Sequence, residues 1–302
     1  MPEGQGPDGA EELAARFEAL RPQLIGAAYR VLGSVTDAED AVQETWLRWA
    51  AVDQATVRDP RAYLLAAATR QALNRVRQQQ SRREDYVGPW LPEPVATGPG
   101  PAEAAELADS VSMAMLVVLE SLSPLERAAF VLHDVYGLTF AEVATTLDRS
   151  EAAARQLANR ARGHVQSRRP AVVDWRRHDA VLEQFVEHLG SGNIEAVLAL
   201  LAPDVVLVSD GGGIKKAALR PLHGPRKVVG WLGGVTQRPD FSAEARLAFE
   251  VLNGELALVV FDGDEVDSVA FVTVEERGIT ALHMVRNPQK LKHAVGSEIA
   301  VD

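Results

Sequence analysis

The spacing of apolar residues changes once along this chain of 302 residues, and this change most limits the folds open to it. From residue 13 to residue 169 apolar positions recur every three or four residues, which is the period of an amphipathic helix. After two further amphipathic stretches, at 175–190 and 193–201, the pattern becomes that of β-strands. The expected strands are Val205–Ser209, Ala243–Leu252, Leu256–Phe261, Val266–Val274 and Ile279–Val285. The sequence therefore predicts a multidomain chain in which all-α domains precede an α+β domain with a curved antiparallel sheet.

A segment rich in proline and glycine divides the helical part in two. Between Gly88 and Pro101 the chain has five prolines and three glycines, so a helix cannot continue through it. The first residues, Met1–Glu12, are rich in glycine, proline and acids and predict a disordered tail. The expected division is a tail at residues 1–12, a helical domain at 13–87, a linker at 88–106, a second helical domain at 107–170 and the α+β domain at 175–302.

Capping residues mark where several of these helices begin. Three pairs have the spacing of a capping box, in which each side chain bonds the backbone N–H of the other residue. These pairs are Thr36 with Glu39, Ser123 with Glu126, and Thr139 with Glu142. The first box opens a helix that is predicted to run through Trp49. Asp59 lies directly before Pro60, which places a capping side chain ahead of a proline at the first helical position.

Composition excludes much of the usual catalytic and metal chemistry. The chain has no cysteine, and its seven histidines form no close pair, so disulfides, thiolate nucleophiles and cysteine-based zinc sites are excluded. We expect no cofactor and no metal. The N-terminus lacks the basic start of a secretory signal, and no apolar run approaches the ~18 residues of a spanning helix. These features predict a cytoplasmic protein without a membrane segment.

Charge is distributed unevenly along the chain. The formal net charge is −11, which argues against nucleic-acid binding if the chain is treated as one object. However, residues 57–83 contain seven arginines and one acid, and residues 149–170 contain six arginines and one acid. All five lysines lie after residue 210, which suggests that the C-terminal part is a separate module. Two basic segments in an acidic chain favour nucleic-acid contacts at these segments.

The second basic segment has the pattern of a helix-turn-helix. A short helix from Thr139 to Leu147 is followed by a tight turn at Asp148–Arg149 and a second helix capped by Ser150. The residues expected to face inward are Ala154, Leu157, Ala161 and Val165. Those expected to face outward are Arg155, Gln156, Asn159, Arg160 and Arg162. Arginine, glutamine and asparagine can contact base edges and phosphates, although any soluble helix has a charged outer face.

Longer motifs make this part of the chain resemble a known family. Residues 20–95 resemble the second region of an extracytoplasmic-function (ECF) sigma factor, with DAEDAVQETWLRW at Asp37–Trp49 and RAYLLAAATRQALNRVRQQ at Arg61–Gln79. LSPLERAAFVLHDVYGLTFAEVA at Leu122–Ala144 resembles the fourth region of such factors, leading into the helix-turn-helix. Two motifs in the expected order are more specific than either motif alone. The resemblance implies a promoter-reading subunit of RNA polymerase.

The resemblance also implies roles for particular residues. The acidic face of the first motif would dock onto the clamp helices of the polymerase β′ subunit, through Asp37, Asp40, Gln43 and Glu44. The residues implied to contact promoter DNA are Arg58, Arg70, Asn74, Arg75, Arg77, Arg149, Ser150, Arg155, Gln156, Asn159 and Arg160. From the residues alone, a solvated amphipathic helix is the preferred interpretation of the acidic face. The basic helix at Arg61–Arg83 could instead bind the acidic C-terminal domain.

Three short motifs narrow the resemblance to sigma factors that carry a SnoaL-like C-terminal domain. They are WLPEP (Trp90, Leu91, Pro92, Glu93 and Pro94), DGGG (Asp210, Gly211, Gly212 and Gly213) and NPQKL (Asn287, Pro288, Gln289, Lys290 and Leu291). The tail commonly reads NPDKL in that group, so Gln289 is a departure. The SnoaL-like fold is a cone-shaped α+β domain. We expect the three motifs to form an inter-domain regulatory contact, in which the C-terminal domain docks on the linker and on the second sigma region.

These observations predict a sigma factor that is regulated in cis by its C-terminal domain. The alternative is an enzyme or a sensor of a small molecule, with Asp210, His223 and Trp231 in a pocket of that domain. An aspartate before three glycines is more typical of a turn, and fold analogy does not establish catalysis, so we expect no enzyme activity. A ligand of the domain stays unidentified. A third alternative is a DNA-binding regulator that acts on duplex DNA without the polymerase.

Overall fold

The computed structural model of the protein describes residues 7–97, 112–168, 174–236 and 245–294. It contains two compact units, which we describe separately. The helical unit comprises residues 1–83, 99–110 and 118–168, and the sheet unit comprises residues 84–98, 111–117 and 169–302. Both segments that flank residues 99–110 therefore belong to the sheet unit, although in the sequence they lie between the two helical halves.

The first half of the helical unit is formed by three long helices. They are α1 (Pro7–Leu32), α2 (Val35–Trp49) and α3 (Pro60–Glu84), with a short 3-10 turn, η1 (Gln54–Thr56), before α3. α1 begins at Pro7, inside the stretch predicted to be a disordered tail. Proline is favourable at a first helical position, and the buried side chains of Leu13 and Phe17 give this helix a packing surface. Residues 1–6 of the predicted tail lie outside the described residues.

The structure corrects one helix start and confirms another. Ser34, rather than Thr36, caps α2, because its Oγ accepts a hydrogen bond from the backbone N–H of Asp37 at 3.2 Å. Gly33 has a positive φ of 70°, which ends α1 and brings Ser34 into the capping position two residues earlier than predicted. Asp59 caps α3 as predicted, accepting a hydrogen bond from the backbone of Ala62 at 3.0 Å.

The second half of the helical unit confirms the helix-turn-helix. It contains α5 (Met113–Glu120), whose first five residues belong to the sheet unit, α6 (Pro124–Phe130), a π turn η2 (Val131–Val135), α7 (Phe140–Leu147) and α8 (Glu151–Arg168). Both predicted capping boxes, at Ser123 and Thr139, are present. Asp148 ends α7 in the left-handed conformation, with φ 53°, and the Ser150 Oγ caps α8. The predicted inward stripe on α8 is buried, and Ala158 is buried beside it.

The sheet unit is an α+β domain. Its elements are α9 (Trp175–Gly190), α10 (Ile194–Leu200), β1 (Leu201–Asp210), β2 (Leu222–His223), α11 (Pro225–Thr236), β3 (Arg246–Leu252), β4 (Glu255–Asp262), β5 (Glu265–Glu275), β6 (Gly278–Val285) and the 3-10 turn η3 (Pro288–Lys290). The predicted strands are present, although β1 begins earlier, at Leu201, and residues 243–244 of the second predicted strand, which corresponds to β3, lie outside the described residues. β2 and α11 were not predicted from the sequence.

The sheet is mixed rather than wholly antiparallel, which corrects the prediction. Its strand order is β2-β1-β6-β5-β4-β3, and β1 pairs with β6 in parallel while every other neighbouring pair is antiparallel. The chain leaves β1, crosses through α11 to the far edge and returns through three hairpins, so β6 arrives beside β1 in the same direction. Alternation of apolar residues shows which face of a strand is buried but not its direction.

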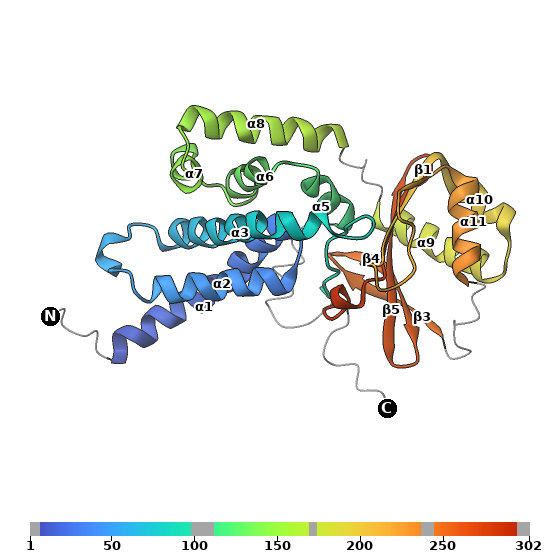
Figure 1. Ribbon diagram of the computed structural model, residues 1–302, viewed down its shortest axis with the longest axis horizontal. Helices are drawn as coiled ribbons and strands as arrows, with labels where there is room; N and C mark the ends of the chain where they lie inside the picture. The colour runs from blue at the N-terminus through green and yellow to red at the C-terminus, as the bar shows by residue number, and fades with distance from the viewer. Residues whose placement is uncertain (1–6, 98–111, 169–173, 237–244, 295–302) are drawn as a thin grey trace. The chain divides into compact units, whose positions relative to one another are not determined.

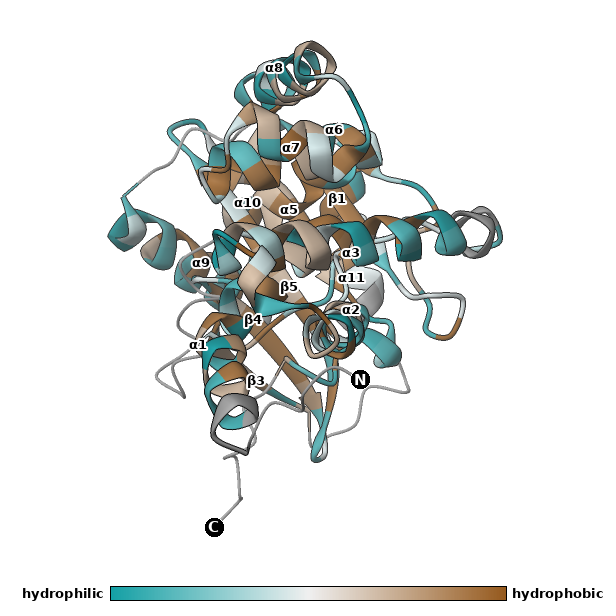
Figure 2. Cartoon of the chain, turned by 90° about the vertical axis from the view of Figure 1, so that its left-hand side faces the viewer, coloured by the Kyte–Doolittle hydropathy of each residue, from teal (hydrophilic) through white to brown (hydrophobic). Residues whose placement is uncertain are grey.

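Different parts of the chain cover the two faces of the sheet. One face packs against α9, α10 and α11 in a core that contains Phe185, Val228 and Leu282 (Figure 1). The other face forms a second core with Phe261 and Phe271 from the sheet and Leu91 from the predicted linker. Met113, Leu291 and Ala294 complete this second core. In Figure 2 the strands of this sheet carry many hydrophobic residues.

Among the described helices, none is both long enough and apolar enough to cross a membrane.

Candidate functional site

The centre of the candidate site is Asp210, at the end of β1 in the sheet unit. Its side chain is completely buried. One carboxylate oxygen accepts hydrogen bonds from the Tyr86 hydroxyl at 2.6 Å and from the backbone N–H of Gly212 at 3.1 Å. The other oxygen accepts from the backbone N–H of Leu91 at 2.8 Å and from the Lys290 Nζ at 2.7 Å. Asp210 therefore binds both the linker and the C-terminal tail.

Lys290 is the buried cation of this site. Besides Asp210, its Nζ donates to the carbonyl of Leu91 at 2.6 Å. The Nζ also lies 3.8 Å from the ring centroid of Trp90 and 5.1 Å from that of Tyr86. Aromatic rings at such distances stabilise a cation through their electron-rich faces, especially where the cation is desolvated. The linker thus supplies a carbonyl and the ring of Trp90 to the ammonium group, and Tyr86, just before the linker, supplies a second ring.

Tyr86, just before the linker, and Asn287, in the C-terminal tail, contact each other beside Asp210. The Asn287 Nδ2 donates to the Tyr86 hydroxyl at 2.9 Å, and its Oδ1 accepts from the backbone of Gln289 at 3.1 Å. Burial and the hydrogen bond to Asp210 hold the pKa of Tyr86 well above its ordinary value. The tyrosine is therefore neutral and acts as a hydrogen-bond donor to Asp210.

The glycines of the DGGG motif allow the loop after β1 to fit under the tail. Gly212 has a φ of 60°, and a Cβ at this position would overlap the side-chain amide of Asn287. A Cβ on Gly213, whose φ is 72°, would come within 3.1 Å of Val87, directly before the linker. A larger residue at Gly212 would therefore strain the backbone and displace Asn287.

The end of the linker is bound to the opposite edge of the sheet. The Thr97 N–H donates to the carbonyl of Val251 at 2.9 Å, and the Asn253 N–H donates to the carbonyl of Val95 at 2.8 Å. Ala96 forms an isolated antiparallel bridge with Leu252. Residues 95–97 therefore add a short stretch of backbone pairing to the outer side of β3.

The start of α5 is bound to the same domain. The Met113 N–H donates to the Glu255 Oε1 at 2.8 Å, and the Met113 side chain is completely buried in the second core. Burial raises the pKa of Glu255 to about 7. The sheet unit thus holds the chain on both sides of residues 99–110.

The structure brings together most of the residues predicted for the regulatory contact. Trp90, Leu91, Asp210, Asn287 and Lys290 meet in one network, and Pro92, Glu93, Pro94 and Leu291 are buried around it. Gln289 is exposed and takes no side-chain part. Sequence reasoning missed Tyr86, Asn253 and Glu255. For Tyr86, the one available signal was its position four residues before the WLPEP motif.

The residues of the alternative pocket are not assembled. Asp210 is covered by the linker, His223 is exposed on β2, and Trp231 packs into the core on the other face of the sheet. Across the described ranges, no group of three or more histidine or acidic side chains is arranged to hold a metal ion.

In the helical unit, Arg75 brings together two of the predicted sites. It donates to Asp40 at 3.3 Å and to Glu44 at 2.7 Å, and its guanidinium lies 3.6 Å from Asp37. Arg75 was predicted to contact DNA, whereas the three acids were predicted to contact the polymerase. Asp40, Gln43 and Glu44 are exposed, so the acidic face of α2 faces solvent with Arg75 at its side.

The two halves of the helical unit contact each other through arginines. Arg70, which was predicted to bind DNA, donates to the carbonyls of Thr145 and Thr146 at the end of α7, at 3.1 Å and 3.0 Å. Arg127 is buried and donates to the carbonyl of Val31 in α1 at 2.7 Å. Arg70 is therefore engaged by the helix-turn-helix in this conformation. Arg58, Asn74 and Arg77 are exposed on the first half.

The outer face of α8 has the exposure that nucleic-acid recognition requires. Arg149, Ser150, Arg155, Gln156, Asn159 and Arg160 are all exposed. Arg155 pairs with Glu151, and Arg160 pairs with Glu126, each at 2.7 Å. The hydrogen bond from Arg160 holds the pKa of Glu126 below its ordinary value. These surface pairs are weak and can exchange for phosphate contacts.

Comparisons with known proteins identify the class to which this arrangement belongs. The sigma-70 region 2 family matches residues 16–82, and the sigma-70 region 4 family matches residues 112–165. The ECF RNA polymerase sigma factor SigJ of Mycobacterium tuberculosis (strain ATCC 25618 / H37Rv) is 40% identical over 291 residues, covering 91% of this chain and 92% of that protein. This chain belongs to the ECF family of RNA polymerase sigma factors.

Two further comparisons extend over the C-terminal domain. The probable ECF RNA polymerase sigma factor SigI of M. tuberculosis (strain CDC 1551 / Oshkosh) is 29% identical and covers 93% of this chain and 95% of its own length. The crystal structure of M. tuberculosis SigJ matches with a TM-score of 0.75 and 38% identity, covering 93% of this chain and 99% of that chain. The order of two all-α domains followed by an α+β domain is therefore shared with SigJ.

Replacing Asp210 tests whether the buried network holds the sheet unit together. In Asp210→Asn the charge of Lys290 stays buried without its anion, so the free energy of unfolding should fall by about 3–5 kcal/mol. Adding Lys290→Met should recover part of this loss, because the unpaired charge is removed. Urea unfolding followed by circular dichroism measures both effects.

The matched control is Asp204→Asn, since Asp204 pairs with Arg277 at the surface of the same unit. Exposed pairs contribute about 0–1 kcal/mol, so this variant should unfold nearly as the unaltered protein does. Equal losses in the two aspartate variants would contradict a special role for the Asp210 network.

Proposed function

We propose that this sigma factor directs promoter-specific initiation of transcription and that its sheet unit regulates it in cis by holding the linker between regions 2 and 4. The observation that carries the regulatory part is the network in which Asp210 and Lys290 bind Tyr86, Trp90 and Leu91. The proposal assigns no catalytic role to the domain and sets its action in the cytoplasm, with RNA polymerase core and promoter DNA as partners.

Anchoring on both sides limits how far the connection between the regions can extend. Residues 84–98 and 111–117 both belong to the sheet unit, so while both flanks are docked this domain, and not the reach of residues 99–110, sets the separation of the two regions. Release of both flanks would free the whole connection, residues 84–117, which could reach about 115 Å. The two elements of a promoter lie at a fixed separation. Docking of the linker would therefore change the fraction of sigma-factor molecules whose two DNA-binding regions match this separation.

The contact of Arg70 with Thr145 and Thr146 also supports regulation within the chain. An arginine that donates to the end of α7 is not available to a DNA phosphate. Binding of a promoter by both regions would therefore compete with this contact. A conformation that occupies a DNA-binding arginine is consistent with a sigma factor whose activity is restrained within the chain.

We assign the remaining roles by the family and by exposure. On α8, Arg155, Gln156 and Asn159 would contact base edges in the major groove, with Arg149, Ser150 and Arg160 on phosphates. In the first half of the helical unit, Arg58, Asn74 and Arg77 would contact the second of the two promoter elements, which α8 does not contact. Asp37, Asp40, Gln43 and Glu44 would dock on the β′ clamp helices, and Arg75 would hold these acids in place.

Reversing Asp40 and Glu44 tests the polymerase contact. Both side chains are about half exposed, at 58% and 48%, so Asp40→Arg with Glu44→Arg should weaken binding to polymerase core at least tenfold through like-charge repulsion. Anisotropy titration of core with the labelled chain measures the affinity. Two exposed acids of α1 give a matched control, Glu11→Arg with Glu18→Arg, which should bind normally.

A third substitution separates docking from folding. Arg75→Glu in the reversed background restores the ion pairs with positions 40 and 44 with inverted sign, so much of the stability should recover while affinity for core stays low. If affinity for core recovered together with stability, Asp40 and Glu44 would stabilise the fold without contacting the polymerase.

In vitro transcription tests regulation by the linker. Trp90→Ala removes a ring from the charge of Lys290 and should release the linker, so the variant should use promoters with a wider range of spacing between the two elements. A chain that stops before Asn287 lacks Lys290 and should behave similarly. Trp175→Ala is the control, because Trp175 is 67% exposed in the same unit. Circular dichroism verifies that each variant is folded.

Two outcomes would overturn separate parts of the proposal. Absence of promoter-specific transcripts with the unaltered chain, core and candidate promoters would contradict the role in initiation. Normal transcription with the same spacing preference in the unaltered chain and in both linker variants would contradict regulation in cis.

A further inference from the structure

The edge of the sheet next to β1 carries a strip of cations that the proposed function does not use. Between Gly211 and Thr236 the chain has five lysines and arginines and no acid, within a protein of net charge −11. Four of these cations are exposed and form no ion pair or side-chain hydrogen bond in the parts of the chain that the structure describes. We call them the basic strip: Lys216, Arg220, Arg226 and Lys227.

The backbone holds Arg220 along one edge of the sheet, with the other three strip residues just beyond the two ends of this edge segment. The Ala218 N–H donates to the Ser209 Oγ at 2.7 Å, β2 pairs antiparallel with β1, and the Gly224 N–H donates to the carbonyl of Val205 at 2.8 Å. Residues 218–224 therefore run back along β1 from Ser209 to Val205, with Lys216 before them and Arg226 and Lys227 after them at the start of α11. At about 3.4 Å per residue this length of strand is about 14 Å.

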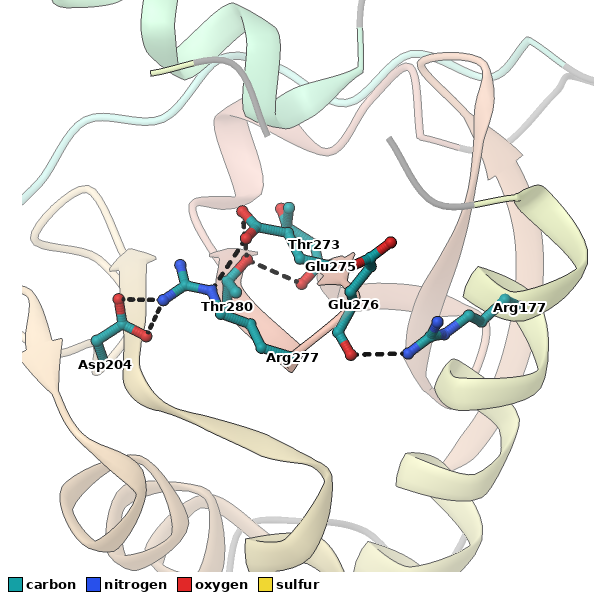
Figure 3. Close-up of polar contacts among 7 residues, drawn as sticks. All are labelled: Arg177, Asp204, Thr273, Glu275, Glu276, Arg277 and Thr280. Carbon is teal, nitrogen blue, oxygen red and sulfur yellow. Dashed lines mark hydrogen bonds and ion pairs between the residues drawn. The ribbon is translucent and has the colours of Figure 1, made fainter. Parts of the chain in front are cut away.

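Two acids on the strands beside the strip, Asp204 and Asp267, are already paired with other cations. Both oxygens of Asp204, which precedes Val205 on β1, accept hydrogen bonds from Arg277 at 2.7 Å (Figure 3). Arg277 also donates to Glu275 at 3.0 Å. Asp267 pairs with Lys215 at 2.7 Å and with Arg286 at 3.0 Å. Since these carboxylates have their own partners, they leave the positive charge of the basic strip available to another anion.

Two cations of the strip lie where a helix disfavours them. Arg226 and Lys227 are in the first turn of α11, next to the positive end of the helix dipole. The comparable arginines of α9 follow Asp174, whose carboxylate caps that helix. α11 is preceded by Gly224, so it has no such acid at that position. A local arrangement that costs stability is expected where the residues serve a function.

We propose that the basic strip binds the phosphate backbone of duplex promoter DNA. This inference rests on the proposed function, which brings the domain and promoter DNA into one complex. Lysine and arginine bind phosphates, and an edge of about 14 Å matches about four phosphates of one strand at 3.4 Å per base pair. Such contacts position the DNA without reading its sequence. The C-terminal domain thus contributes affinity for the promoter as well as control of the linker.

The salt dependence of promoter binding tests this surface. Each phosphate contact contributes about 0.9 to the slope of log K against log salt concentration. In holoenzyme reconstituted with the full chain, Arg226→Ala with Lys227→Ala should lower the slope by about 2, and addition of Lys216→Ala and Arg220→Ala should lower it by about 4 in total. The matched control is Arg176→Ala with Arg177→Ala in the first turn of α9, which should leave the slope unchanged.

The absence of cysteine from the chain allows a direct test of proximity. An iron chelate attached through Lys227→Cys should cleave promoter DNA in the holoenzyme complex, whereas the same chelate attached through Arg176→Cys should not. Cleavage of polymerase subunits without cleavage of DNA would assign the strip to a protein partner and overturn the proposal.

The two proposals fail differently. Suppose that the unaltered chain directs promoter-specific transcription but the strip variants leave the salt slope unchanged. This result would overturn only the proposed DNA contact of the basic strip. Unaltered chain that directs no such transcription would overturn the proposed function, and with it the role of the strip.

Discussion

The ion pair between Asp210 and Lys290 is the constraint on which the arrangement of the sheet unit depends. Both side chains are buried, at 0% and 6% exposure, so their charges need a complete set of hydrogen-bond partners. Tyr86 and Leu91 supply two of the donors to Asp210, and Leu91 also supplies a carbonyl to Lys290. Since Leu91 belongs to the linker and Tyr86 lies just before it, displacement of this segment would leave both charges incompletely satisfied. The pair and the docked linker therefore stabilise each other.

This kind of interaction suits a regulatory contact. The cost of desolvating two charges offsets much of their attraction, so a buried ion pair adds specificity with little net stability. A linker held in this way has one defined docked position, and it can be released by changes of a few kcal/mol. The anchor at Met113 holds the other flank of the connection to the same domain. The domain thus acts on the segment that joins the two promoter-reading regions, while the basic strip gives it a contact of its own with DNA.

The sequence predicted what depends on neighbouring residues. The helix-turn-helix, its capping boxes and the inward stripe of α8 follow from local spacing, and the structure confirms them. The cap of α2 was predicted two residues late, because the positive φ of Gly33 was not considered. Local spacing does not reveal contacts between residues distant in the sequence. Examples are the hydrogen bonds of Tyr86 with Asp210 and of Val95 with Asn253. The parallel pairing of β1 with β6 was missed for the same reason, since no local pattern encodes it.

The central claim is that the linker is an integral part of the C-terminal domain, and hydrogen exchange at the amide of Leu91 tests it most directly. This N–H donates to the buried carboxylate of Asp210, so it can exchange only when the network opens. In the full-length chain we predict protection of Leu91 comparable to that of the β5 amides, and loss of this protection in Asp210→Asn. Exchange of Leu91 in the unaltered chain at the rate of an unstructured peptide would contradict the account.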